Sequence, residues 1–161
     1  STYLNLEKAL TGKRENGLFH DWDFTEPKVG APDYKEIRLS YDKYNRPSYV
    51  FSEEDGMYWR FLNGEPHLDL ATKEQIKTRN LIVQYAKHRS LNTDLLHIDI
   101  DLVGEGKAEY FLGGKYQEGI WKKKNYKSPT IYLDGEGKPI VFVEGNTWVQ
   151  VVRHNREVVK Q

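Results

Sequence analysis

Short runs of strand-forming residues alternate with turn signals through the C-terminal third of this chain. The runs Gly119–Lys123 and Thr147–Val152 each carry a Trp, and Pro129–Ile140 lies between them with Asp134-Gly135 near its centre. β-Branched and aromatic residues favour strands, whereas Asp, Asn and Gly favour the turns that join them. The pattern therefore predicts consecutive β-strands in this region, with little helix.

The same alternation extends through most of the 161 residues. Further strands are predicted in the ranges 34–41, 48–51, 57–62, 80–86, 95–103 and 107–112. Asp55-Gly56 is expected to join two of them as a hairpin, and Asn63-Gly64 to turn the chain again. About nine to eleven short strands predict a single mainly-β domain, either an antiparallel sandwich or a partly open barrel.

The range 95–103 carries the clearest strand signal, because its apolar and polar residues alternate with a period of two. The apolar residues are Leu96, Ile98, Ile100 and Leu102, and the polar ones include His97, Asp99 and Asp101. We expect the apolar face to pack and the polar face to be solvated. An imidazole and two carboxylates are possible ligands of a cation, but such side chains lie about 7 Å apart and splay. No fourth ligand is evident, so no metal site is predicted here.

The ends of the chain are expected to differ from the β domain in the range 34–153. Residues 1–33 predict a short N-terminal helix ending near Gly12, then a loop that Trp22 and its aromatic neighbours pin to the same domain. The range 154–161 is polar and is predicted to be a fraying tail. Within the β domain, Thr72 is expected to cap one helical turn in the range 72–78.

Composition excludes several classes of function. Lys and Arg total 24 and Asp and Glu total 24, so no global attraction to nucleic acid is expected, and no nucleic-acid partner is predicted. Without cysteine, the chain has no disulfide, no thiolate nucleophile and no cysteine-based zinc site. No run of about 18 apolar residues is present, so no membrane span is expected. The chain starts at Ser1 rather than Met, which suggests a mature or excised fragment. No cofactor motif is found, and no cofactor is expected.

Arg60, His67 and Asp69 form the most interesting polar group, because the Asn63-Gly64 turn is expected to fold the last two back towards Arg60. A bidentate pair of Arg60 with Asp69 would then lie beside Tyr58 or Trp59. Such a group could bind a carboxylate or a sugar. The alternative is an ion pair that only stabilises a turn.

A basic run follows Trp121 and consists of Lys122, Lys123, Lys124 and Lys127. Basic residues beside an aromatic such as Tyr126 can bind an anionic polymer. The alternative is a solvated hairpin tip that protects a sheet edge from aggregation. Trp121 and Trp148 themselves are expected in the core, and each indole N–H then needs an acceptor.

Several segments resemble the C-terminal domain of YerB-type lipoproteins, a family found mainly in Gram-positive bacteria. The matching segments are Tyr41-Asp42, Tyr58-Trp59-Arg60, His67-Leu68-Asp69, Asn80–Gln84, Gly104–Ala108, Gly119–Lys122, Asp134–Lys138 and Thr147–Val152. The resemblance implies an extracytoplasmic protein of unknown activity, anchored to the membrane through a lipidated N-terminus in the full-length protein. It also implies that the larger N-terminal half and the lipidated Cys lie outside this sequence. It supplies no catalytic residues.

The leading hypothesis is therefore a non-catalytic binding or scaffold domain that contacts a protein or a cell-envelope component. One alternative is an envelope-active hydrolase that uses carboxylates with Arg60 and His67. The other is a structural domain that supports the missing N-terminal half. The sequence leaves the oligomeric state and the identity of the partner open.

Overall fold

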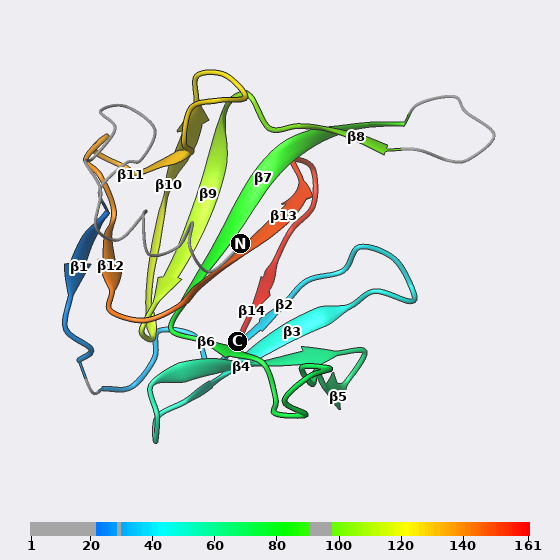
Figure 1. Cartoon of the computed structure of the whole chain (residues 1–161), viewed down its shortest axis with the longest axis vertical. Coiled ribbons are helices and arrows are strands. Elements are labelled where there is room, and N and C mark those ends of the chain that lie inside the picture. The colour runs from blue at the N-terminus through cyan, green and yellow to red at the C-terminus, as the bar shows by residue number, and fades with distance from the viewer. Residues whose placement is uncertain (1–21, 29, 91–97) are drawn as a thin grey trace, which may run out of the picture.

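A computed structural model describes residues 22–28, 30–90 and 98–161 as a mainly-β domain (Figure 1). The N-terminal helix predicted before Gly12 lies outside the described residues, and so does His97. Two six-stranded sheets pack as a sandwich, and the described strands do not close into a barrel. The mainly-β sandwich predicted from the sequence is confirmed.

The larger sheet contains the long strands of the molecule. Its order is β11-β10-β9-β7-β13, and β8 pairs with the far end of β7. The strands are β7 (Asn80–Ser90), β8 (Ile98–Asp101), β9 (Gly104–Leu112), β10 (Lys115–Lys123), β11 (Ile131–Asp134) and β13 (Thr147–Arg153). Neighbours are antiparallel except β13, which runs parallel to β7. This parallel edge was not predicted, because turn signals report only on strands that follow one another directly.

The smaller sheet has the order β14-β2-β3-β4-β5, and β6 also pairs with β4. The strands are β2 (Glu36–Arg38), β3 (Pro47–Ser52), β4 (Met57–Leu62), β5 (Glu65–Pro66), β6 (Lys77–Thr78) and β14 (Val159–Lys160). The predicted hairpin at Asp55-Gly56 joins β3 to β4, and Gly56 there has a φ of 65°. Positive φ is accessible to glycine without steric cost, which explains the residue at this turn.

The centre of the larger sheet is buried on both of its faces. One face packs on the smaller sheet through a cluster that includes Leu81, Val83 and Phe111. The other face is covered by a parallel pair of strands, β1 (Asp23–Thr25) with β12 (Val141–Val143), and by Trp22, which stacks on Phe142. Strand β7 is therefore continuously buried from residue 80 to residue 86, without alternation.

Trp121 lies in the second core cluster, as the sequence predicts, with 2% of its surface exposed. Its indole Nε1–H donates to the carbonyl of Tyr85 at 2.8 Å, which satisfies the buried donor. Gly106 makes this contact possible, because a Cβ there would lie 2.6 Å from both the Trp121 nitrogen and the Tyr85 oxygen.

Strand β8 does not pack as the alternation in the range 95–103 predicts. Figure 1 shows β8 on an arm that leaves the body of the larger sheet together with the end of β7. Ile100 and Leu102 are each 38% exposed, so the apolar face of this strand is not covered by the core. A period of two shows that two faces differ in polarity, but it does not say whether a second layer is present.

The range 154–161, predicted to be a fraying tail, belongs to the fold. Val158 is buried, and β14 pairs with β2. Gln161 and Glu36 exchange two backbone hydrogen bonds of 2.9 Å. Two apolar residues among polar ones are too weak a signal for a strand, but an edge of the smaller sheet was open to receive them. The β fold thus extends beyond the predicted range 34–153 at both ends, since β1 and β14 lie outside it.

The helical turn predicted at Thr72 is replaced by a tight turn. The Asp69 carboxylate accepts the backbone N–H groups of Ala71 and Thr72, each at 2.9 Å, and the chain then enters β6. An Asx turn of this kind competes with helix formation for the same N–H groups. None of the described segments forms a helix with the length and apolar character needed to cross a membrane.

Replacing Gly119 by Ala is expected to destabilise the domain by about 2 kcal/mol or more, because overpacking forces strands apart. A Cβ at Gly119 would lie 1.9 Å from the carbonyl oxygen of Leu133, across the β10–β11 pair. Chemical denaturation measures the change. Gly135→Ala is the matched control, since its Cβ would meet only the Glu118 oxygen at 3.9 Å. Equal stability of the two variants would contradict the packing described here.

Candidate functional site

Arg60 is the most unusual charged residue among those described. It lies on β4, faces the core between the two sheets, and is only 7% exposed. Its Nε–H donates to the Tyr49 hydroxyl at 3.1 Å, and its guanidinium lies over the ring of Trp148, 4.9 Å from the centroid. Nη1 is buried and has no hydrogen-bond partner in the described part of the chain. No carboxylate there lies within ion-pair distance of Arg60, although a buried charge normally has a counter-charge.

A chain of polar groups connects Arg60 to the edge strand β13. Tyr49 accepts from Arg60 and donates to Gln150 Oε1 at 2.7 Å. The Gln150 amide donates to the Tyr41 hydroxyl at 2.5 Å, and Trp148 Nε1–H reaches Gln150 Oε1 at 3.3 Å. Burial raises the pKa of Tyr49 to about 12, although the nearby Arg60 charge opposes this shift. The Tyr49 phenol therefore stays neutral and orients the guanidinium without cancelling its charge.

His67 lies next to Arg60, as the turn at Asn63-Gly64 predicts. Its backbone N–H donates to the Arg60 carbonyl at 3.0 Å, one residue beyond the last β4–β5 pair, Phe61 with Pro66. His67 Nδ1 is also buried without a partner among the described residues. Two adjacent residues thus each present a buried nitrogen that nothing in the described structure satisfies.

The predicted pair of Arg60 with Asp69 is not formed. Asp69 lies in the exposed turn after β5, where its carboxylate accepts backbone N–H groups. Hydrogen bonds from the backbone of Thr72 and Ala71 hold the pKa of Asp69 below its usual value. The Asp69 carboxylate is satisfied by hydrogen bonds within its own turn and makes no contact with Arg60.

The two aromatic neighbours in the predicted group have separate roles. Tyr58 is fully buried in the core, with its ring 4.9 Å from that of Phe51. Trp59 points to the opposite face of β4, and its Nε1–H donates to Asp55 at 3.1 Å. The aromatic residues that do surround Arg60 are Tyr49 and Trp148. The sequence places both in strands, but it gives no signal that β3 and β13 meet at Arg60.

The basic run after Trp121 lies at the end of β10 and in the turn that follows. Lys122 pairs with Glu105 at 3.3 Å, and Lys123 donates to the carbonyl of Ser128. Lys124 and Lys127 are exposed. Two of the four lysines therefore have partners within the fold, which leaves two charges on the exposed turn.

Asp99 and Asp101, the candidate cation ligands, instead face Arg89 on the β7–β8 arm, at 3.6 and 3.9 Å. His97, the third candidate, lies outside the described residues. Across the described ranges, no group of three or more His, Asp or Glu side chains is placed to hold a metal ion.

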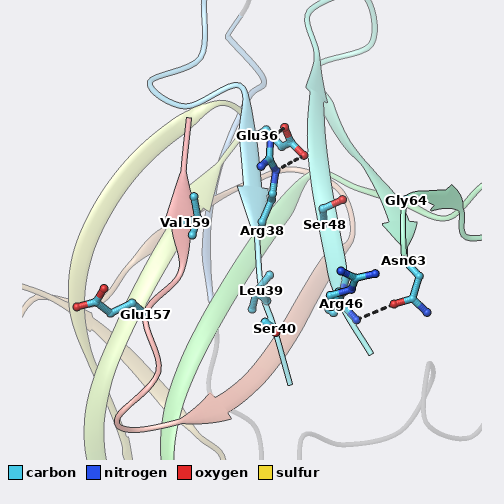
Figure 2. Close-up of a pocket in the computed structure, with 11 residues that line it drawn as sticks. Glu36, Arg38, Leu39, Ser40, Arg46, Ser48, Asn63, Gly64, Glu157 and Val159 are labelled. Carbon is cyan, nitrogen blue, oxygen red and sulfur yellow. Dashed lines mark hydrogen bonds and ion pairs between the residues drawn. The ribbon is translucent and has the colours of Figure 1, made fainter. Parts of the chain in front are cut away.

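A cavity of about 410 Å³ lies between β2, β3 and the segment that leads to β14, and Figure 2 shows its lining. Leu39 and Pro47 contribute to its apolar lining. Arg38 at its edge already binds Glu36 through two hydrogen bonds of 2.8 Å, and these lower the pKa of Glu36. The Arg46 backbone N–H donates to Asn63 Oδ1 at 3.1 Å. The charged groups of this cavity are thus exposed or paired, unlike Arg60.

Glu109 is a second buried charge, and it is fully satisfied. It is 1% exposed and accepts from Lys160 Nζ at 2.5 Å, from Tyr85 at 2.5 Å and from Tyr116 at 2.7 Å. Burial alone would raise the pKa of Glu109, but these hydrogen bonds outweigh it and hold the pKa below the usual value. The sequence does not reveal this residue, because a Glu in a strand usually faces solvent.

Glu109→Gln is expected to lower the free energy of unfolding at pH 7 by about 2 kcal/mol, because it leaves Lys160 without its counter-charge. Because folding lowers the Glu109 pKa, this stabilisation is present above about pH 4.5 and is lost as the pH falls through the folded-state value. Urea denaturation between pH 3 and pH 7 should therefore show a smaller difference at low pH. A difference independent of pH would contradict the role of the charge.

Comparisons with known proteins agree with this architecture. The family model described as the C-terminal domain of a protein of unknown function, DUF3048, matches residues 37–149. YerB of Bacillus subtilis, whose name describes it as a candidate lipoprotein, is 29% identical over 125 residues, which make up 76% of this chain and 37% of YerB.

The crystal structure of Bacillus subtilis YerB superposes with a TM-score of 0.72 over 99% of this chain, at 21% identity. That likeness shows the fold. The chain spans only 53% of the solved YerB chain, so the activity of such a longer protein is not established for this domain by similarity. Because the family model covers more than half of the sequence, this chain belongs to the DUF3048 family as an example of its C-terminal domain.

Proposed function

We propose that this chain is a non-catalytic binding domain of an extracytoplasmic lipoprotein, and that its partner is a protein or a component of the cell envelope. The description of YerB as a candidate lipoprotein supports the location. Attachment to the membrane would occur through a lipidated N-terminus of the longer protein.

The observation that carries this proposal is the buried Arg60 without a counter-charge. Its Nη1 lacks a partner in the described structure, and so does the neighbouring His67 Nδ1. Unsatisfied buried groups cost stability, so proteins rarely keep them unless another role requires them. A partner that brings an acceptor to Arg60 would satisfy both the charge and the hydrogen bonds.

The arrangement around Arg60 and His67 gives little support to the alternative of an envelope-active hydrolase. A hydrolase of the proposed kind needs a carboxylate beside Arg60 and His67, and Asp69 instead caps an exposed turn. A supporting role for a missing half would require a broad apolar face. The large exposed apolar residues of the described structure form several small groups, such as Phe24 with Val141 on the paired strands β1 and β12, Leu68 with Leu70, and Ile100 with Leu102.

Arg60→Met is expected to lose binding but to keep the fold. Replacing a buried ion by an apolar residue of similar volume is often neutral or stabilising, so the free energy of unfolding should change by less than about 1 kcal/mol or should rise. The loss of the hydrogen bond to Tyr49 is the main opposing effect. Urea denaturation measures stability, and retention of envelope components on immobilised protein measures binding.

Arg46→Met is the matched control, because Arg46 is exposed and lines the cavity beside β2 and β3, whose lining does not include Arg60. The envelope fraction of the source bacterium supplies both proteins and wall polymers. A component retained by the native chain and by Arg46→Met, but not by Arg60→Met, supports the proposal. Retention that does not depend on Arg60, or a collapse of stability in Arg60→Met, would assign Arg60 to the fold alone.

A further inference from the structure

We propose that the Arg60 site recognises a monoanionic group with two terminal oxygens, a carboxylate or a phosphodiester, and that Trp148 is its gate. This inference rests on the binding function proposed above and names the chemistry of its ligand.

The charge balance of the site selects a single negative charge. Arg60 carries one permanent positive charge, and its hydrogen-bonded neighbour Tyr49 is a neutral phenol. One negative charge would neutralise the buried guanidinium. A dianion would leave an uncompensated negative charge in the same buried place, which is unfavourable at low dielectric.

Two nitrogens of the site have no partner among the described residues and are able to donate to the oxygens of a ligand. Nη1 of Arg60 has unused N–H groups, and Nδ1 of His67 donates in one of the two neutral tautomers. The two residues are neighbours, because the His67 backbone N–H donates to the Arg60 carbonyl at 3.0 Å. Charge-assisted hydrogen bonds to an oxyanion are about twice as strong as neutral ones, so such a ligand would gain most from Arg60.

Trp148 controls access to the guanidinium. Its ring lies against Arg60, it is only partly buried, and it belongs to β13, an edge strand of the larger sheet. Its indole Nε1–H is held by one long hydrogen bond, 3.3 Å to Gln150. A bond of that length is weak, so rotation of the indole away from Arg60 costs mainly the cation–π contact and the packing of the ring against the core cluster. The ligand would then exchange a cation–π contact for an ion pair at the same guanidinium.

Titration of the ¹⁵N-labelled chain, followed through the Trp148 indole N–H signal, tests this inference. Trp148→Phe identifies the signal among those of the four tryptophans. The probes are sodium acetate, sodium dimethyl phosphate and, at pH 8, inorganic phosphate, each against sodium chloride at equal ionic strength. We expect a saturable shift with acetate or dimethyl phosphate, and a rise in Tm of about 2 to 4 °C at saturation.

Variants test whether Arg60 and His67 donate the hydrogen bonds that hold the monoanion. Arg60→Met should weaken the binding at least about tenfold and His67→Ala about threefold, since a hydrogen bond from a charged group contributes more than one from a neutral group. Arg46→Met should leave it unchanged. Saturation by acetate alone identifies a carboxylate, and saturation by dimethyl phosphate alone identifies a phosphodiester.

Several results would overturn the inference. They are the absence of a saturable shift with both monoanions, a shift that persists in Arg60→Met, and tighter binding of inorganic phosphate than of either monoanion. An envelope component that is retained through Arg60 while no monoanion binds would reject the ligand class and keep the binding function. Monoanion binding without any retained component would reject the proposed partner and keep the site chemistry.

Discussion

A sheet whose central strands are buried on both faces determines how this domain is built. Strands β7 and β9 have no solvated side over residues 80–86 and 108–112, so each polar side chain there needs a partner from a covering layer. Asn80 exchanges two hydrogen bonds with the backbone of Val143 in β12, at 2.7 and 3.0 Å. Gln84 accepts from Tyr132 in β11 at 3.0 Å, and Glu109 binds Lys160 in β14. The buried polar residues thus attach the outer elements to the central sheet.

Arg60 is an exception to this rule, and so are the Tyr58 hydroxyl, His67 Nδ1 and Arg79 Nε, which are also buried without a partner among the described residues. The buried polar groups of the larger sheet are paired, whereas the guanidinium that faces them from β4 keeps a nitrogen without a partner in the described structure. Arg60 differs from these residues in carrying a buried charge that no carboxylate of the described structure neutralises, and the proposed binding function rests on this difference.

Local sequence signals predicted well those features that depend on neighbouring residues. The strands from Met57 to Leu62 and from Thr147 to Arg153, and the hairpin at Asp55-Gly56, follow from residue type and turn chemistry. The choice of Arg60 and His67 as neighbours also succeeded, because a short turn at Asn63-Gly64 leaves few alternatives. The predicted ion pair of Arg60 with Asp69 was wrong for an equally local reason. The Asp69 carboxylate accepts backbone N–H groups of its own turn instead.

The sequence by itself determined the class of the fold, the short hairpins and the exclusion of cysteine chemistry, because these depend on composition and on contacts between near neighbours. Only the tertiary structure decided which strands meet across long loops. It placed β13 parallel to β7, brought Trp148 over Arg60, and carried Lys160 to Glu109. Such contacts join residues far apart in the chain, and no local pattern records them. The candidate site therefore emerges from the packing of the two sheets, while its central charge was visible in the sequence.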